Sequence, residues 1–192
     1  MAVVLSLSGS PSPTSRTARL LRHLDDRLRA HGHEVVPLDA RRLPAEALLG
    51  ADPHHPDIVE VAELVRAADG LVVGTPIYKA AYSGLLKALL DLLPQYALAG
   101  KTVLPLATGG STAHVLAVDY ALRPVLASMG PRHITQGWFV LDRDIQVGAD
   151  GAVTLPAGTA GPLELVVDGF ARELAGRAGA EPAARPHPRA AA

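Results

Sequence analysis

A loop rich in hydroxyl groups follows the first apolar run of the chain. Residues 9–17 read Gly-Ser-Pro-Ser-Pro-Thr-Ser-Arg-Thr and precede a segment with helical periodicity. Hydroxyls, free backbone N–H groups, the positive end of a helix and the Arg16 guanidinium would meet there, which suits a phosphate. The loop has neither a Walker motif nor a Gly-x-Gly-x-x-Gly fingerprint, so it favours a monophosphate over a pyrophosphate. Alternatively, its hydroxyls only cap the helix.

A second candidate loop, residues 74–84, follows the uninterrupted apolar run 70–74. Its small residues and the rigid Pro76 would let the backbone lie close to a flat ligand. The ring of Tyr78 could contact that ligand, and Lys79 could meet an anionic group. The alternative is a turn followed by a helix cap at Ser83, with the aromatic side chains packed on a neighbouring subunit.

A third candidate loop, residues 107–114, contains the adjacent glycines Gly109 and Gly110. Adjacent glycines leave backbone N–H groups uncovered, and such donors can stabilise negative charge that develops on a bound ring. His114 could assist them, although a histidine that begins a helix is more often a capping or packing residue.

The segments between these loops alternate in the manner of parallel βαβ units. The predicted strands are 2–8, 34–38, 70–74, 102–107 and 133–141, although Pro105 is awkward inside a central strand. The predicted helices are about 15–31, 57–68, 83–93, 112–129 and 160–178. We expect residues 40–57 to be irregular and residues 142–158 to form a turn-rich excursion, with a hairpin around Asp150 and Gly151. Residues 1–178 are then one domain, and 179–192 an Ala/Pro/Arg-rich disordered tail.

This pattern predicts an α/β fold with a five-stranded parallel sheet in the order 2-1-3-4-5 and helices on both faces. In such doubly wound sheets, ligands bind at the carboxyl ends of the strands. The three loops follow the first, third and fourth strands, so we expect them to meet at one edge of the sheet.

The composition narrows the classes of function. The chain has 192 residues, no cysteine and a formal net charge of −1. Thiol catalysis, disulfides and cysteine-ligated metals are therefore excluded, and no general attraction to nucleic acid or anionic membranes is expected. The histidines lack metal-ligand spacing, so we predict no metal site. The chain begins without a secretory signal pattern, and we expect it to be cytoplasmic.

Three blocks of sequence resemble the NAD(P)H-dependent FMN reductase family, over about residues 1–140. They are Gly-Ser-Pro with Ser-Arg at 9–16, Ala-Asp-Gly-Leu at 68–71 continuing through Thr-Pro-Ile-Tyr-Lys-Ala-Ala-Tyr-Ser-Gly at 75–84, and Leu-Pro-Leu-Ala-Thr-Gly-Gly at 104–110 followed by His114. The likeness is greatest to the members that supply alkanesulfonate monooxygenase with reduced flavin during sulfur starvation.

The resemblance implies a flavodoxin-like fold that binds FMN at the three loops and reduces it with NADPH or NADH, by hydride transfer to flavin N5. It also implies a homodimer or homotetramer, release of reduced flavin to a two-component monooxygenase, and a place in sulfur assimilation. The implied cofactor-binding residues are Ser10, Ser15, Arg16 and Thr17 in the first loop, Pro76, Ile77, Tyr78 and Lys79 in the second, and Thr108, Gly109, Gly110, Ser111 and His114 in the third. No catalytic acid–base residue is required, because the chemistry belongs to the flavin.

Two further residues matter in this resemblance. Tyr120 occupies the place where relatives have a π-bulge at a tetramer interface. Ser12 stands where relatives often have a basic residue, which leaves Arg16 as the one obvious cation of the first loop and weakens the expected retention of FMN. Two other functions remain open: an FMN-bound quinone or azo reductase, and a non-enzymatic electron carrier like flavodoxin.

Overall fold

The computed structural model describes residues 1–176. Its strands are β1 (Val3–Ser8), β2 (Glu34–Asp39), β3 (Gly70–Tyr78), β4 (Ala81–Tyr82), β5 (Thr102–Gly109), β6 (His133–Ile134), β7 (Trp138–Leu141), β8 (Gln146–Val147) and β9 (Val153–Thr154). Its α-helices are α1 (Arg16–Ala30), α2 (Ala45–Leu49), α3 (Pro56–Ala67), α4 (Gly84–Leu92), α5 (Arg123–Ser128) and α6 (Ala157–Ala175). The tail predicted at 179–192 lies outside the described residues, and the single domain 1–178 stays a prediction.

A parallel sheet forms the centre of the molecule. Its strands lie in the order β2-β1-β3-β5-β6, and β7 pairs with β5 beyond β6. The predicted order 2-1-3-4-5 is therefore confirmed, with β6 and β7 as two parts of the fifth strand. The short β4 adds an antiparallel hairpin to β3, which the sequence did not predict.

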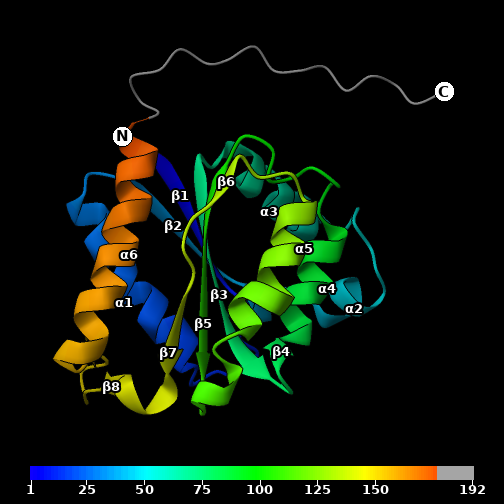
Figure 1. The fold of residues 1–192 in the computed structure, drawn as a ribbon. Helices are drawn as coiled ribbons and strands as arrows, with labels where there is room; N and C mark the ends of the chain where they lie inside the picture. The colour runs from blue at the N-terminus through cyan, green and yellow to red at the C-terminus, as the bar shows by residue number, and fades with distance from the viewer. Residues whose placement is uncertain (177–192) are drawn as a thin grey trace.

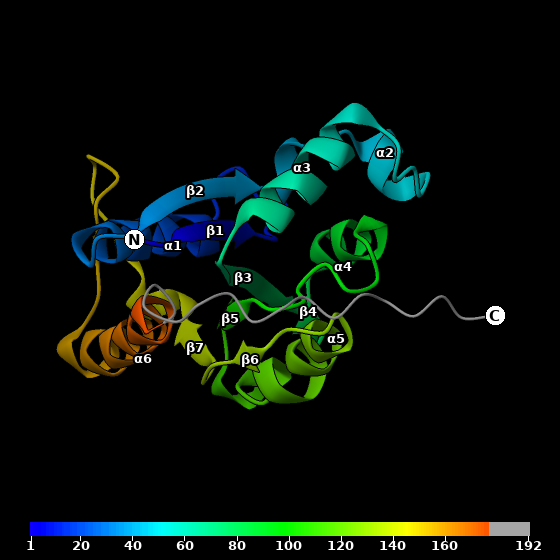
Figure 2. The same ribbon diagram turned by 90° about the horizontal axis from the view of Figure 1, so that it is seen from above.

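Helices cover both faces of this sheet (Figures 1 and 2). Helices α1 and α6 lie on one face, and α3, α4 and α5 lie on the other. Phe170 of α6 and Leu24 of α1 are buried in the first core, with Val4 of β1. Leu89 of α4 and Ile58 of α3 are buried in the second. No described helix is long and apolar enough to cross a membrane.

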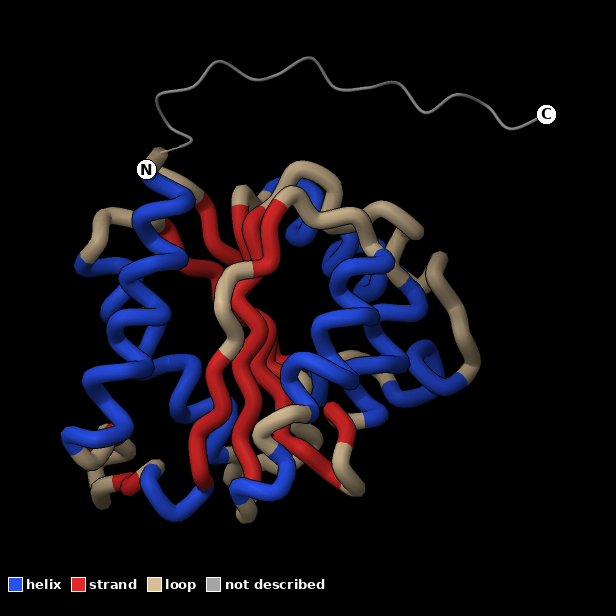
Figure 3. Tube along the Cα trace, in the orientation of Figure 1, coloured by secondary structure: helices blue, strands red, loops and turns tan. Residues whose placement is uncertain are grey.

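The fifth strand is interrupted, and this explains Pro105. The N–H of Thr135 donates to the Val103 carbonyl, so the backbone of residue 105 faces the same side of β5. There the chain leaves the sheet between β6 and β7 (Figure 3). Gly137 lies against this point, and a Cβ added to it would be 3.1 Å from the Pro105 carbonyl oxygen and 2.5 Å from Val118 Cγ1. Pro105 therefore lies at a position of β5 where no neighbouring strand requires a backbone N–H donor.

The prediction of one continuous helix at 112–129 is wrong. This segment comprises a 3₁₀ turn at Thr112–His114, a π-helix at Val118–Leu122 and α5. A π-helix around Tyr120 is what the resemblance implies, and Tyr120 itself is exposed. The extra residue in the π-turn breaks a helical periodicity that looks continuous in the sequence.

The sequence predicts irregular structure at residues 40–57 and a turn-rich excursion at residues 142–158. Residues 40–57 are not wholly irregular, since they contain a 3₁₀ turn at Ala40–Arg42 and helix α2, which buries Leu48. The hairpin expected around Asp150 and Gly151 is confirmed by the pairing of β8 with β9.

An ionic cluster ties the two helices on one face together. The Arg27 guanidinium of α1 donates two hydrogen bonds to the Asp168 carboxylate of α6, at 2.7 and 2.8 Å. His31 Nε2 lies 2.8 Å from the same carboxylate. The hydrogen bonds from Arg27, followed by that from His31, lower the pKa of Asp168 to about 2.

We expect Asp168→Asn to lower the free energy of unfolding at neutral pH by about 1–2 kcal/mol. Because the folded state lowers the pKa of Asp168, its contribution is complete above about pH 4 and is lost as the pH falls toward 2. Urea unfolding measured across this range should thus show a weaker acid dependence in the variant. Asp26→Asn, which removes an exposed partner of Arg29, is the control. If the free energy of unfolding depends on pH equally in wild type and Asp168→Asn, the lowered pKa of Asp168 does not contribute to stability.

Candidate functional site

The three candidate loops meet at one edge of the sheet, at the carboxyl ends of β1, β3 and β5 (the lower edge in Figure 1). A cavity of about 620 Å³ opens there. This volume lies within the range of ordinary ligand pockets. The predicted site residues that line it are Ser10, Ser15, Arg16, Thr17, Pro76, Ile77, Tyr78, Thr108 and Gly109.

The first loop presents polar groups at the start of α1. Ser15 caps the helix by accepting a hydrogen bond from the Ala18 N–H at 3.0 Å. Ser10 is buried and its Oγ accepts from the Ser12 N–H at 3.3 Å. The capping alternative therefore describes part of the role of Ser15, but both hydroxyls also line the cavity and keep a proton to donate to a ligand.

Hydrogen bonds hold this loop to the other two. The hydroxyls of Thr17 and Thr108 lie 2.7 Å apart, and both side chains are buried. The Ser83 hydroxyl donates to the Gly9 carbonyl and accepts from the Leu86 N–H, which caps α4 as predicted. The Ser83 N–H in turn donates to Thr75 Oγ1 at 3.0 Å. Because these groups are buried, the hydrogen bonds fix the relative positions of the loops.

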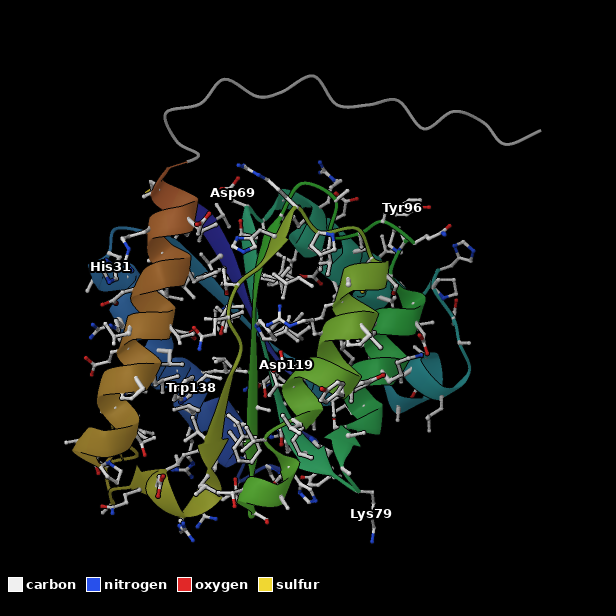
Figure 4. The ribbon with its side chains drawn as sticks, viewed as in Figure 1. His31, Asp69, Lys79, Tyr96, Asp119 and Trp138 are labelled. Atoms are coloured by element: carbon white, nitrogen blue, oxygen red, sulfur yellow. The ribbon has the colours of Figure 1, made fainter. Side chains whose placement is uncertain are left out.

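The second loop is a tight hairpin. Ile77 pairs with Tyr82, and Tyr78 pairs with Ala81. The two residues between them, Lys79 and Ala80, have φ angles of 51° and 64°, a left-handed conformation that is unusual without glycine or asparagine. The turn presents the half-exposed Tyr78 to the cavity, whereas Lys79 points outward from the hairpin tip (Figure 4) and is not part of the lining.

The third loop contributes only its first part to the cavity. Thr108 and Gly109 line it, whereas Gly110, Ser111 and His114 lie beyond the lining. The Ser111 hydroxyl accepts from the Ala113 N–H and so caps the 3₁₀ turn that contains His114. The cofactor-binding roles of Lys79, Gly110, Ser111 and His114 therefore stay predictions.

Other lining residues did not enter the predicted site. They are Ser12, Thr14, Arg19, Asp142, Val147 and Gly148. Ser12 and Thr14 belong to the predicted loop, and Arg19 follows Arg16 by three residues, which places both on one side of a helix. Arg16 is therefore not the one cation at this cavity. Asp142 directly follows the predicted fifth strand, so its place at the carboxyl edge could have been predicted. No signal in the sequence places Val147 and Gly148 there, because their position depends on the path of the chain after β7.

The lining residues fit a phosphorylated flat ligand. Hydroxyls, a helix N-terminus and two guanidinium groups form one part of the cavity, which suits a phosphate. Pro76, Ile77 and Tyr78 form another part, where a ring could stack, and Thr108 and Gly109 lie beside it. Within residues 1–176, no group of three or more histidine and acidic side chains is arranged to hold a metal ion.

Comparisons with known proteins agree with this description. A family model described as NADPH-dependent FMN reductase matches residues 2–146. A similar relative is an FMN reductase (NADPH) of Pseudomonas putida strain KT2440, 51% identical over 143 residues, which cover 74% of this chain and 73% of the relative.

Two solved structures extend the comparison to the fold. The apo form of an NADH:FMN oxidoreductase (EMOB) matches with a TM-score of 0.83 and 41% identity, over 98% of this chain and 97% of that one. An archaeal flavodoxin matches with a TM-score of 0.58 and 9% identity, over 90% of this chain and 99% of that one. The second match bears on the fold alone and confirms that it is flavodoxin-like.

Proposed function

The chain belongs to the NADPH-dependent FMN reductase family, and from this premise we propose that it reduces FMN with NAD(P)H at the cavity between the three loops. The observation that carries the proposal is the meeting of Arg16, Tyr78 and Thr108, from three distant parts of the chain, around one cavity. When bound, FMN supplies N5 as the acceptor of a hydride from the nicotinamide.

The residues of this chain then bind FMN and orient its ring. Ser10, Ser15 and Arg16 would hold the phosphate, with Thr17 fixed to Thr108 behind them. Pro76 to Tyr78 would line the ring. Backbone N–H groups at Gly109, with Gly110 and Ser111 next in the chain, would stabilise negative charge on its polar edge. No side chain needs to donate or accept a proton during hydride transfer, so we assign no catalytic acid or base.

The test of this function is an NAD(P)H oxidation assay on the purified protein. We expect oxidation of NADPH or NADH that depends on added FMN, and comparison of the two nucleotides identifies the preferred one. Absence of oxidation with either nucleotide at saturating FMN would contradict the proposal. Kinetics with a quinone in place of free FMN would distinguish the quinone-reductase alternative.

The partner and the assembly are further proposals. The resemblance supports transfer of reduced FMN to a two-component monooxygenase in sulfur assimilation, in the cytoplasm. The exposed apolar side chains of Val115, Leu116 and Tyr120 beside the π-helix support assembly into a homodimer or homotetramer through this surface. Sedimentation measurements on wild type and Tyr120→Ala test the assembly, since the variant should dissociate at a higher concentration than wild type.

A further inference from the structure

Helix α1 begins with an unusual arrangement of charge. Helix N-termini favour acidic residues, because the macrodipole is positive there. The first turn of α1 has no acidic residue, and it contains Arg16, with Arg19 immediately after it. Neither guanidinium forms an ion pair within residues 1–176, whereas Arg27 and Arg29 further along α1 both do. Such a breach of a local rule is expected where function requires it.

Both arginines face the same cavity. Arg16 and Arg19 are three residues apart on the helix, so their side chains are neighbours. Arg19 is only partly exposed, unlike Arg16, and it lines the cavity together with the first loop. The lining includes one carboxylate, that of Asp142, with which neither arginine forms an ion pair in the described residues. The helix end and two guanidinium groups therefore concentrate positive potential on one part of the cavity.

We propose that Arg19 binds the phosphate of the flavin together with Arg16. This pair of arginines makes the chain select FMN over riboflavin. The proposal rests on the proposed function and deepens it. A phosphomonoester carries between one and two negative charges at neutral pH, and two adjacent guanidinium groups match that charge and its several acceptor oxygens. Riboflavin has the same ring and ribityl chain but ends in a neutral hydroxyl. Arg19 also supplies a second cation to a loop that has Ser12 and Pro13 but no basic residue before Arg16.

Replacement of Arg19 is expected to have opposite effects on the stability of the free protein and on its affinity for FMN. Without a ligand, Arg19 is repelled by Arg16 and by the helix dipole, so Arg19→Gln should leave the melting temperature of the free protein unchanged or raise it. With FMN, the same substitution removes an attractive partner of the phosphate. A residue that only packs would instead lower stability and affect both flavins equally.

The experiment measures Kd for FMN and for riboflavin by quenching of flavin fluorescence. We expect Arg19→Gln to raise Kd for FMN by about 5- to 20-fold and to change Kd for riboflavin by less than about twofold, from the loss of one partly exposed charge-assisted contact. Arg19→Lys should restore most of the selectivity, because it keeps the charge. Arg22→Gln, one turn further along α1 and outside this cavity, should change neither Kd.

Two results would overturn the role of Arg19 while leaving the proposed function intact. One is an equal rise of Kd for both flavins in Arg19→Gln, and the other is an unchanged Kd for FMN. A wild-type protein that binds no FMN and shows no FMN-dependent oxidation of NAD(P)H would instead remove the proposed function, and the selectivity with it. Melting curves of each free variant show that it is folded.

Discussion

Arg16→Ala is expected to raise Kd for FMN by about 10- to 100-fold, the loss that follows when a charge-assisted contact to a phosphate is removed. Arg16 is the first residue of α1 and lines the cavity beside Ser10 and Ser15. Because we propose that Arg16 binds the phosphate and does not contact the ring, kcat at saturating FMN should fall by less than about threefold. Flavin titration and steady-state kinetics on the same preparation measure both quantities.

The control for this variant is Arg41→Ala, which removes an exposed arginine outside the cavity. It should leave Kd unchanged. If Arg16→Ala keeps the wild-type Kd, the phosphate assignment fails and the first loop only caps its helix. If kcat falls as much as the affinity, the residue acts on the reaction and not on the phosphate.

Ser83→Ala is expected to lower the free energy of unfolding by about 2–4 kcal/mol, as the sum of a lost helix cap and a buried carbonyl left without its donor. Ser83 is 1% exposed, caps α4 and donates to the Gly9 carbonyl of the first loop. Because it joins the first loop to the second, FMN affinity should fall as well. Urea unfolding of the free protein gives the first effect, and flavin titration gives the second.

Ser128→Ala provides a matched comparison. Its hydroxyl donates to the Val125 carbonyl on an exposed surface of α5, so its loss should cost less than about 0.5 kcal/mol. Similar small losses in both variants would show that Ser83 does not hold the loops together.

The features that could be predicted from the sequence are those with a local cause. Apolar runs such as 70–74 identify buried strands, and serine caps at Ser15 and Ser83 identify helix starts. Gly32 follows the C-cap residue of α1, with a φ of 81° that favours glycine. Since parallel strands present their carboxyl ends at one edge, the meeting of the three loops followed from the order of the elements.

The features that could not be predicted depend on distant contacts. Lys79 and Ala80 form a two-residue hairpin without the glycine or asparagine that would signal it, so β3 appeared to end at Gly74. The break in the fifth strand lies where Gly137 meets Pro105 and Val118, which are far apart in the sequence. Val147 and Gly148 also line the cavity, and their position depends on the path that the chain takes after β7.

Both borders of the sheet are unsuited to accepting a further strand. The Glu34 N–H donates to the Ala2 carbonyl, so the alternation along β2 turns the nitrogen of Pro37 toward the outer border, where it has no hydrogen to offer. On the opposite border, β6 and β7 present two and four residues with a departure of the backbone between them. A growing fibril needs a long regular ladder as its template. The protein should therefore resist strand-to-strand aggregation at high protein concentration.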